Sequence, residues 1–361
     1  MPDATPYAGA VDHYTSAARR DWVKRAWEEP AFRQHLDAAL GRAAALGLAR
    51  DLDVLDLGCG TGVGLDLLLG TRAVGAGTVR VARYTGLDLD PALLAVARDR
   101  LAGPDGPPTG VGAVDLVEGD LADVPEVGPR DLVLSSGVPL SHLPPDALGP
   151  ALTRLVARAT APERPALLVI DVLGRWSLEW TSRWDRTRWE YRMSFFASEA
   201  AAGATPMTTW DGADLERTVR AAVAAAGRAV RDLVRVDRSL GVGRHTTTRE
   251  YTPDLPRLRG LIDVLAEADE PEGVAAVAAR LHLDPALPEA PAVVLDAHRR
   301  FIAAWNALVA PAADPAGEVA RAPGAGAALA TALRALEADL EPLGLGLGHS
   351  LTLFAVVGGA A

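Results

Sequence analysis

The sequence predicts an α/β protein with a seven-stranded, mostly parallel sheet that has helices on both faces. Short apolar runs alternate with helical segments from residue 51 onward, and these runs are continuously apolar, as in strands buried on both faces. A glycine-rich turn joins the first run to the helix that follows it. We therefore expect an N-terminal helical cap, a main α/β domain, a helical insertion and a final strand, at residues 1–50, 51–245, 246–346 and 347–361.

The expected strands recur along the chain, with helices between them. They are the apolar runs at residues 54–57, 84–87, 114–117, 131–134, 166–170, 230–236 and 351–357. The first helix of the domain is expected at residues 63–69. The second begins at Pro91, after the cap residue Asp90, and stops before Gly103. Two later helices are marked by apolar faces, at Leu148, Leu152, Leu155 and Val156 and at Leu215, Val219 and Val223.

Two regions outside this alternation predict helices only. Residues 14–48 lack the alternation of a strand, and Trp22, Ala26 and Trp27 recur at helical spacing. Residues 253–345 are rich in Ala, Pro and Glu and predict several helices joined by loops. For residues 311–326, where Pro, Ala and Gly dominate, a disordered link is the alternative.

The composition argues against several classes of protein. The chain has 36 basic and 47 acidic residues, for a net charge of −11, whereas nucleic-acid binders usually carry a basic surface. No apolar run is long enough to predict a membrane span, and residues 1–4 show no secretory signal. Cys59 is the single cysteine, which excludes an internal disulfide and favours a reducing, cytoplasmic location. No clustered set of metal ligands is visible, so no metal site is predicted.

The most informative segment is the glycine-rich turn after the first expected strand. Glycine occupies every second position from Gly58 to Gly64. Glycines permit positive φ and let a ligand lie against bare backbone, and open α/β sheets bind ligands at the carboxyl ends of their strands. The spacing does not contain the G-x-G-x-x-G pattern of dinucleotide sites, and no Gly-Lys-Ser/Thr follows, so a phosphate-binding loop is disfavoured.

This segment, Val54 to Gly62, resembles the first motif of the class I methyltransferases that use S-adenosylmethionine (SAM), a family with a Rossmann-like fold. The resemblance continues in order through Gly86-Leu87-Asp88, Glu118-Gly119-Asp120-Leu121 and Asp131-Leu132-Val133-Leu134-Ser135-Ser136-Gly137, and the last apolar run is similar to the family's antiparallel final strand. It implies that Asp88 binds the ribose hydroxyls, that Asp120 and Leu121 contact the adenine, and that Ser136 lies near the methionine part.

The cofactor expected from this resemblance is SAM. We expect the binding residues to be Asp56, Gly58, Cys59, Gly60, Gly62, Asp88, Leu89, Asp120, Leu121 and Ser136 in the main domain. In the N-terminal segment, His13 and Tyr14 would act as a lid. Arg19 or Arg20 would bind the methionine carboxylate as a bidentate fork, and a solvated helix face is the alternative for these arginines. Cys59 is expected to be a small packing residue rather than a nucleophile.

The acceptor of the methyl group is less well marked. His142 and His245 are candidate general bases, and loop-stabilising hydrogen bonds are the alternative role for both. Trp176, Trp180 and Trp184 recur at i, i+4 and i+8, which predicts a cover helix packed on the sheet, with Trp189 slightly offset. The alternative is an aromatic-walled acceptor pocket with interleaved arginines.

The resulting hypothesis is methyl transfer to oxygen or nitrogen of a small molecule or short peptide, with the helical insertion forming an acceptor chamber. The Asn/Asp-Pro-Pro-Tyr/Phe motif for methylating base amino groups is absent after the fourth strand, so nucleic acid is not the expected acceptor. The alternatives are a non-catalytic SAM-binding regulatory protein, an aminopropyltransferase that uses decarboxylated SAM, and an NAD-dependent oxidoreductase. The oligomeric state is not predicted.

Overall fold

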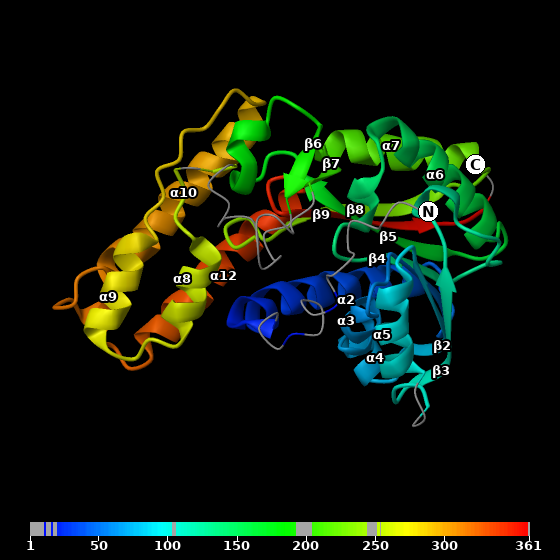
Figure 1. Cartoon of the computed structure of the whole chain (residues 1–361), viewed down its shortest axis with the longest axis horizontal. Helices are drawn as coiled ribbons and strands as arrows, with labels where there is room; N and C mark the ends of the chain where they lie inside the picture. The colour runs from blue at the N-terminus through cyan, green and yellow to red at the C-terminus, as the bar shows by residue number, and fades with distance from the viewer. Residues whose placement is uncertain are drawn as a thin grey trace.

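The computed structural model describes residues 11, 16, 20–102, 106–192, 204–243, 251–252 and 254–359. A twisted sheet with helices on both sides forms one part of the molecule, and a group of helices, α8 to α12, stands beside it (Figure 1). Among the described residues, no helix is long and apolar enough to cross a membrane.

Seven strands run in the order β3-β2-β1-β4-β5-β9-β8. The first five are parallel, and β9 is antiparallel to both of its neighbours. Every strand predicted from the sequence is confirmed, with small shifts at the ends. Their bounds are β1 Asp51–Leu57, β2 Arg80–Asp88, β3 Val111–Glu118, β4 Leu132–Ser135, β5 Ala166–Gly174, β8 Val230–Arg238 and β9 Ser350–Val357.

The predicted count of seven strands is too low, because the sheet has nine. The two additional strands, β6 Arg188–Arg192 and β7 Ala204–Trp210, form an antiparallel pair. Strand β7 joins the sheet by pairing in parallel with the last residues of β5, Leu173 and Gly174. The pair therefore extends the sheet at the carboxyl end of β5, beyond the point where β4 stops.

The predicted tryptophan helix is also wrong. Residues Leu178–Arg183 form only a short 3₁₀ segment, η5, in which Trp180 has non-helical dihedral angles (φ −145°, ψ 48°), and Trp189 lies in strand β6. The packing role expected for these rings is nevertheless correct, since Trp176, Trp180, Trp184 and Trp189 are all buried. The rings contact one another, at centroid distances such as 5.8 Å for Trp176 and Trp184.

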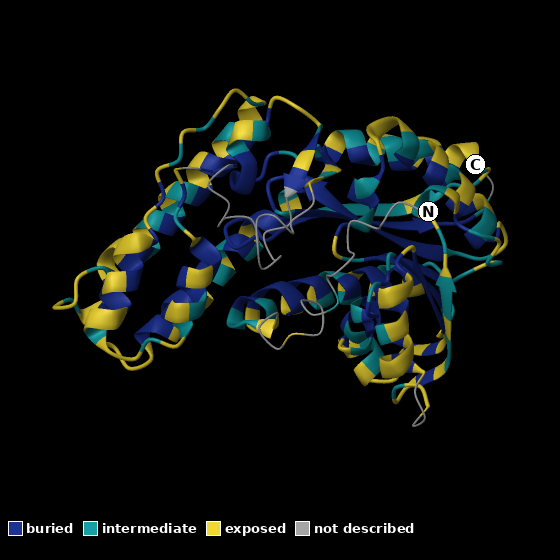
Figure 2. Ribbon diagram, viewed as in Figure 1, coloured by how far each residue is buried: buried dark blue, intermediate teal, exposed yellow. Residues whose placement is uncertain are grey.

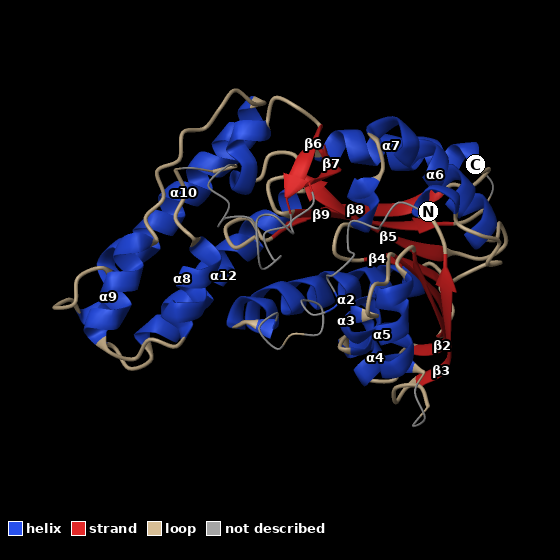
Figure 3. Cartoon of the chain, viewed as in Figure 1, coloured by secondary structure: helices blue, strands red, loops and turns tan. Residues whose placement is uncertain are grey.

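Helices cover the two faces of the sheet (Figure 3). On one face lie α2 Glu29–Ala45, α3 Val63–Leu69 and α5 Pro91–Leu101, whose apolar residues share a core with side chains of β1 to β5, β8 and β9. On the other lie α6 Pro145–Ala159 and α7 Gly212–Ala225. The strands between them are mostly buried and the outer helix faces are exposed (Figure 2), as the continuous apolar runs predict.

The predicted helical insertion before the last strand is present. Its described residues form five α-helices and the short 3₁₀ segment η6 Glu341–Leu343. The α-helices are α8 Leu258–Ala266, α9 Pro271–Arg280, α10 Ala292–Ala312, α11 Glu318–Arg321 and α12 Ala325–Leu340. The disordered link considered for residues 311–326 is not found, since α10 continues through Pro311 and α11 fills much of the remainder. The apolar faces of these helices share one core with the tryptophan cluster and with Val23 and Trp27 of the N-terminal segment.

A buried carboxylate joins the insertion to the rest of the molecule. Glu337 of α12 is fully buried and accepts four hydrogen bonds. Its Oε1 accepts from Trp27 Nε1 at 2.9 Å and from Ser239 N at 3.0 Å, and its Oε2 accepts from Leu240 N at 2.8 Å and Gly241 N at 3.2 Å. One side chain thus holds the N-terminal helix, the insertion and the segment after β8 in register.

We predict that Glu337→Gln destabilises the protein. An amide has one acceptor oxygen, so either orientation leaves two of the four buried donors facing another donor, at a cost of at least about 2 kcal/mol in the free energy of unfolding. Denaturant unfolding would measure this. Asp339→Asn, on the exposed face of the same helix, is the matched control and should change little. Equal stability of the two variants would contradict the anchoring role.

Candidate active site

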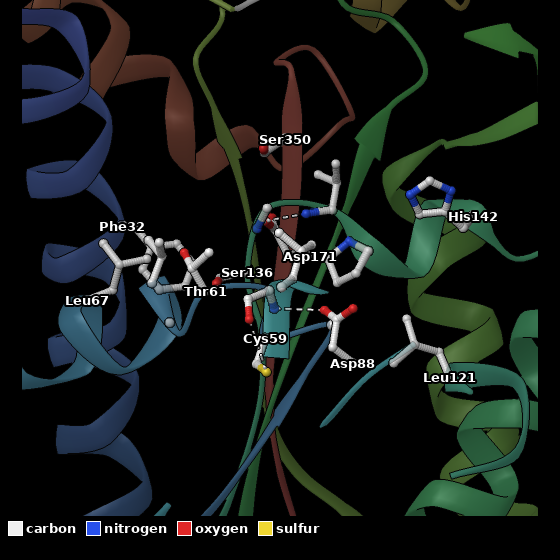
Figure 4. A pocket seen from close by; sticks show the side chains of 18 of the residues that line it. Phe32, Cys59, Thr61, Leu67, Asp88, Leu121, Ser136, His142, Asp171 and Ser350 are labelled. Carbon is white, nitrogen blue, oxygen red and sulfur yellow. Dashed lines mark hydrogen bonds between the residues drawn. The ribbon is translucent and has the colours of Figure 1, made fainter. Parts of the chain in front are cut away.

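A cavity of about 390 Å³ lies at the carboxyl ends of the parallel strands, where the strand order reverses between β1 and β4. This is the place where open α/β sheets bind ligands. Its wall is built from the turns after β1 to β4, from Asp171 of β5, from the N-terminal helix, and from the end of β8 and the start of β9 (Figure 4). The predicted site residues in this wall are Gly58, Cys59, Gly60, Asp88, Leu89, Asp120, Leu121, Ser136 and His142.

The glycine turn after β1 forms the floor of the cavity. Gly58, Gly60 and Gly62 all have positive φ (64°, 52° and 83°), which explains the alternate spacing. A side chain on Gly60 would point into open space, so the backbone itself is presented to the cavity. Gly64 is glycine for a different reason: it lies in the first turn of α3 against the Asp56 carboxylate, with which any side chain would overlap.

Two of the predicted cofactor residues, Asp56 and Gly62, do not line the cavity. Asp56 is buried beneath the turn, where its Oδ2 accepts a hydrogen bond from the Tyr84 hydroxyl at 2.6 Å. Burial raises the pKa of Asp56 to about 7, against the lowering effect of Tyr84. Asp56 therefore supports the glycine turn from below. Gly62 also supports the turn, from its place at the start of α3.

Asp88 and Asp120 stand at the ends of neighbouring strands on one side of the cavity. The Asp88 carboxylate accepts from Gly60 N at 2.7 Å and from Asp90 N at 2.9 Å, which ties the end of β2 to the glycine turn. Burial raises the pKa of Asp88, and these backbone hydrogen bonds oppose the shift. Asp120 caps the 3₁₀ segment η3, Leu121–Asp123, by accepting from Ala122 N at 2.8 Å. Both side chains therefore have fixed positions.

The turn after β4 carries Ser136 and leads to His142 on the opposite side of the cavity from Phe32 (Figure 4). Its Gly137 and Val138 amides donate to Asp171 Oδ2 at 2.9 and 3.3 Å, and Val138 has a positive φ of 63°. His142 ends the 3₁₀ segment η4, Pro139–His142. Burial lowers the pKa of His142 to about 4, with the Arg188 cation contributing, so the ring is neutral and weakly basic at pH 7.

Sequence reasoning missed several residues of the wall. Arg238 ends β8 and could have been predicted from the sequence, because the carboxyl end of any strand parallel to β1 lies at this edge of the sheet. Its buried guanidinium donates to Asp171 Oδ1 at 2.7 Å and to Thr352 Oγ1 at 2.9 Å. Tyr191 of β6, Met207 of β7 and His349 also line the cavity, but they come from strands that were not predicted or from the start of the last one.

The N-terminal helices contribute Lys24, Glu28, Glu29 and Phe32 to the wall, which sequence reasoning also missed. Arg20, the predicted carboxylate ligand, is absent from it; its side chain is 66% exposed and lies 3.6 Å from Glu29. The other predicted residues of this segment, His13, Tyr14 and Arg19, and the candidate base His245, lie outside the described residues.

The remaining expectations concern Cys59 and metals. Cys59 lines the cavity but is buried, and burial together with Asp56 and Asp88 raises the pKa of its thiol, which agrees with a packing residue. No group of three or more His, Cys, Asp or Glu side chains with metal-binding geometry occurs in the part of the chain that the structure describes.

Comparison with known proteins agrees with this geometry. A family model described as "Methyltransferase domain" matches residues 54–163, the segment that carries the glycine turn, Asp88, Asp120 and His142. No curated protein matches the chain.

Solved structures similar to this chain include several methyltransferases. A SAM-dependent methyltransferase from Clostridium acetobutylicum is 13% identical, with a TM-score of 0.42, over 64% of this chain and 90% of that one. CalS10, an amino pentose methyltransferase from Micromonospora echinaspora, is 20% identical, with a TM-score of 0.37, over 65% and 92%. Magnesium protoporphyrin IX methyltransferase from Synechocystis is 16% identical, with a TM-score of 0.36, over 65% and 92%.

These structural likenesses assign no substrate to this chain. The identification depends on the match of the family model to residues 54–163, on the nucleotide-type site at the switch point of the sheet, and on the strand order with its antiparallel β9. The chain therefore carries a methyltransferase domain with the class I, Rossmann-like strand order, which is the fold of methyltransferases that use S-adenosylmethionine.

Proposed function

We propose that this enzyme methylates an oxygen or nitrogen of a small molecule. The observation that carries the proposal is that one cavity contains two unlike halves. The first half is formed by the glycine turn, Asp88 and Asp120. The second is formed by His142, Tyr191 and Met207, which come from segments outside the nucleotide-type motifs. A donor and an acceptor bound in these halves would face one another within one enclosed space.

The first half fits SAM. Asp88 offers two carboxylate oxygens to the vicinal ribose hydroxyls, Asp120 and Leu121 lie where the adenine would bind, and the bare backbone at Gly60 permits close approach. Among the described residues, the wall holds six carboxylates, Glu28, Glu29, Asp88, Asp90, Asp120 and Asp171, but two cations, Lys24 and Arg238, which favours a cationic ligand. When bound, SAM supplies a methyl group on a positively charged sulfur.

Arg238 is the residue that we propose for the methionine carboxylate, in place of Arg20. Its guanidinium stacks over the Phe32 ring at 4.7 Å and is held by Asp171 and Thr352 through Nη2 and Nε. Among the described residues Nη1 has no hydrogen-bond partner. A fixed guanidinium with remaining donors at a cavity wall suits a carboxylate.

The second half limits the acceptor. A cavity of about 390 Å³ is within the range of sites for small molecules, roughly 300–1,000 Å³, and here it must hold the donor as well. Leu143, Tyr191 and Met207 make much of this half apolar. The net charge of −11 also argues against a nucleic-acid acceptor.

We retain the proposed division into an N-terminal cap, a SAM-binding domain, an insertion and a final strand, with one change of role. No described residue of the insertion lines the cavity. The insertion instead packs against the buried tryptophans of residues 176–189. His298 of α10 stacks on Trp184 at 5.3 Å, and its Nε2 donates to Trp176 O at 2.6 Å. We therefore propose that it is a buttress of the acceptor half.

We predict that Asp88→Ala weakens binding of S-adenosylhomocysteine by about 10-fold or more, since hydrogen bonds to a charged group contribute about 1.5–3 kcal/mol. The variant also releases the Gly60 amide, which adds to the loss. Isothermal titration calorimetry measures the effect. Asp115→Ala, at an exposed carboxylate of β3, is the control and should bind normally. Unchanged affinity of Asp88→Ala would refute the ribose assignment.

We further predict that Arg238→Met distinguishes two ligands. Binding of S-adenosylhomocysteine should weaken by about 10-fold, because a charge-assisted contact is lost, whereas 5′-methylthioadenosine, which lacks the amino acid, should bind as in the wild type. The second ligand also reports whether the site is still folded, and Arg238→Lys provides a milder change. Arg20→Met should leave both affinities unchanged. Parallel loss of both ligands with Arg238→Lys, or selective loss with Arg20→Met, would overturn the assignment.

A further inference from the structure

A second histidine of the cavity wall, His349, is paired with a buried acid. The Nδ1 atom of His349 forms a short hydrogen bond with Glu179 Oε2. Glu179 is fully buried, and the His349 side chain is 13% exposed and lines the cavity. Burying a carboxylate is costly in free energy unless partners compensate for the lost hydration. The hydrogen bond with His349 provides such compensation for Glu179.

Hydrogen bonds to neighbouring segments hold both members of the pair in place. The backbone of His349 lies between β5 and β8, since its N–H donates to Ser239 O at 3.0 Å and its C=O accepts from Gly174 N at 3.3 Å. Its ring packs on Trp180 at a centroid distance of 5.6 Å. Glu179 lies in η5, where its N–H donates to Ser177 Oγ at 3.2 Å. Gly243 leaves room for the carboxylate, because any side chain there would overlap with it.

The pairing decides which ring nitrogen is basic. A carboxylate only accepts hydrogen bonds, so Nδ1 donates, and in the neutral ring the lone pair is then on Nε2. A positive charge on the ring would be stabilised by Glu179. His142 has the opposite environment, because burial and Arg188 lower its pKa to about 4. His349 is thus a histidine that a buried carboxylate orients, with Nε2 as its acceptor atom.

We propose that His349 is the general base of the reaction, that Glu179 is its positioning residue, and that the acceptor is a hydroxyl compound such as a phenol or an alcohol. This inference rests on the proposed function. The acceptor's oxygen bonds to the methyl carbon while the carbon–sulfur bond breaks with its electron pair staying on sulfur. Nε2 takes the hydroxyl proton and later returns it to solvent. Any donor that Nε2 accepts from in the free protein is replaced by the acceptor's hydroxyl.

A hydroxyl acceptor explains the pair better than an amine or a thiol. A neutral amine attacks through a lone pair that it already has, and a thiol ionises readily in water, whereas a hydroxyl needs its proton removed as it reacts. The apolar wall formed by Leu143, Tyr191 and Met207 gives the body of such a molecule a surface to pack against. His142 would then donate or accept a hydrogen bond without changing its charge.

The first test needs no acceptor. Nitrogen-15 spectra of histidine-labelled protein, saturated with S-adenosylhomocysteine, should show His349 with a protonated Nδ1 and an unprotonated Nε2, assigned through loss of the signals in His349→Gln. Glu179→Gln should produce a mixture of tautomers. A protonated Nε2 in neutral wild-type His349 would overturn the proposal. Failure to bind S-adenosylhomocysteine would instead reject the proposed function itself.

The second test measures turnover of SAM with a panel of catechols, alcohols, amines and thiols, by formation of S-adenosylhomocysteine. His349→Gln should lower kcat on a hydroxyl acceptor by about 100-fold or more, with KM and the affinity for S-adenosylhomocysteine within about twofold. The loss should be much smaller on nitrocatechol, which is already ionised near neutral pH. Glu179→Gln should follow the same pattern to a lesser degree.

His282→Gln, at an exposed histidine, is the control and should retain full turnover. An equal loss on ionised and un-ionised acceptors would mean that His349 is only structural. Turnover of amines or thiols alone, or of no panel member by a protein that binds S-adenosylhomocysteine, would contradict a hydroxyl acceptor.

Discussion

One buried carboxylate, Asp171, holds together the edge of the sheet on which the active site is built. From the last part of β5 it accepts hydrogen bonds from the Gly137 and Val138 amides, from Arg238 and from the Thr352 hydroxyl. The β4 turn, the end of β8 and the start of β9 are therefore fixed to one point. Because removing one partner of a buried charge costs about 3–5 kcal/mol, this arrangement has little freedom to vary, and the positions of Ser136 and His349 depend on it.

Strands β6 and β7, the insertion and the N-terminal helix together close the cavity on the side away from the nucleotide-type motifs. The extra strands β6 and β7 extend the sheet beyond β4 and bring Tyr191 and Met207 to the wall. The tryptophans that pack behind these strands are themselves covered by the insertion, with which they share one continuous apolar core. Glu337 then anchors this cover to the N-terminal helix, which carries Phe32 into the cavity wall from the other side.

The nucleotide half of the site could be predicted from sequence because its signals are local. A strand, a glycine turn and a helix lie within about twenty residues, and the acids at Asp88 and Asp120 end strands that are themselves apparent as apolar runs. The acceptor half could not be predicted from the sequence, because the residues that contact one another there are far apart in the chain. His349 and Glu179, for example, are separated by 170 positions. The tryptophans misled because rings three or four residues apart suit a helix as well as an irregular segment, and only pairing with residues 204–210 shows that Trp189 lies in a strand.

Calorimetric titration of the folded protein with S-adenosylhomocysteine would show whether the cavity at the strand ends binds SAM through its nucleotide half. NAD serves as the comparison ligand, because the spacing of the glycine turn is the feature that separates the two cofactors. We expect one S-adenosylhomocysteine to bind per chain in the micromolar range or tighter, with no heat of binding for NAD. Tight binding of NAD, or of neither ligand, would contradict it.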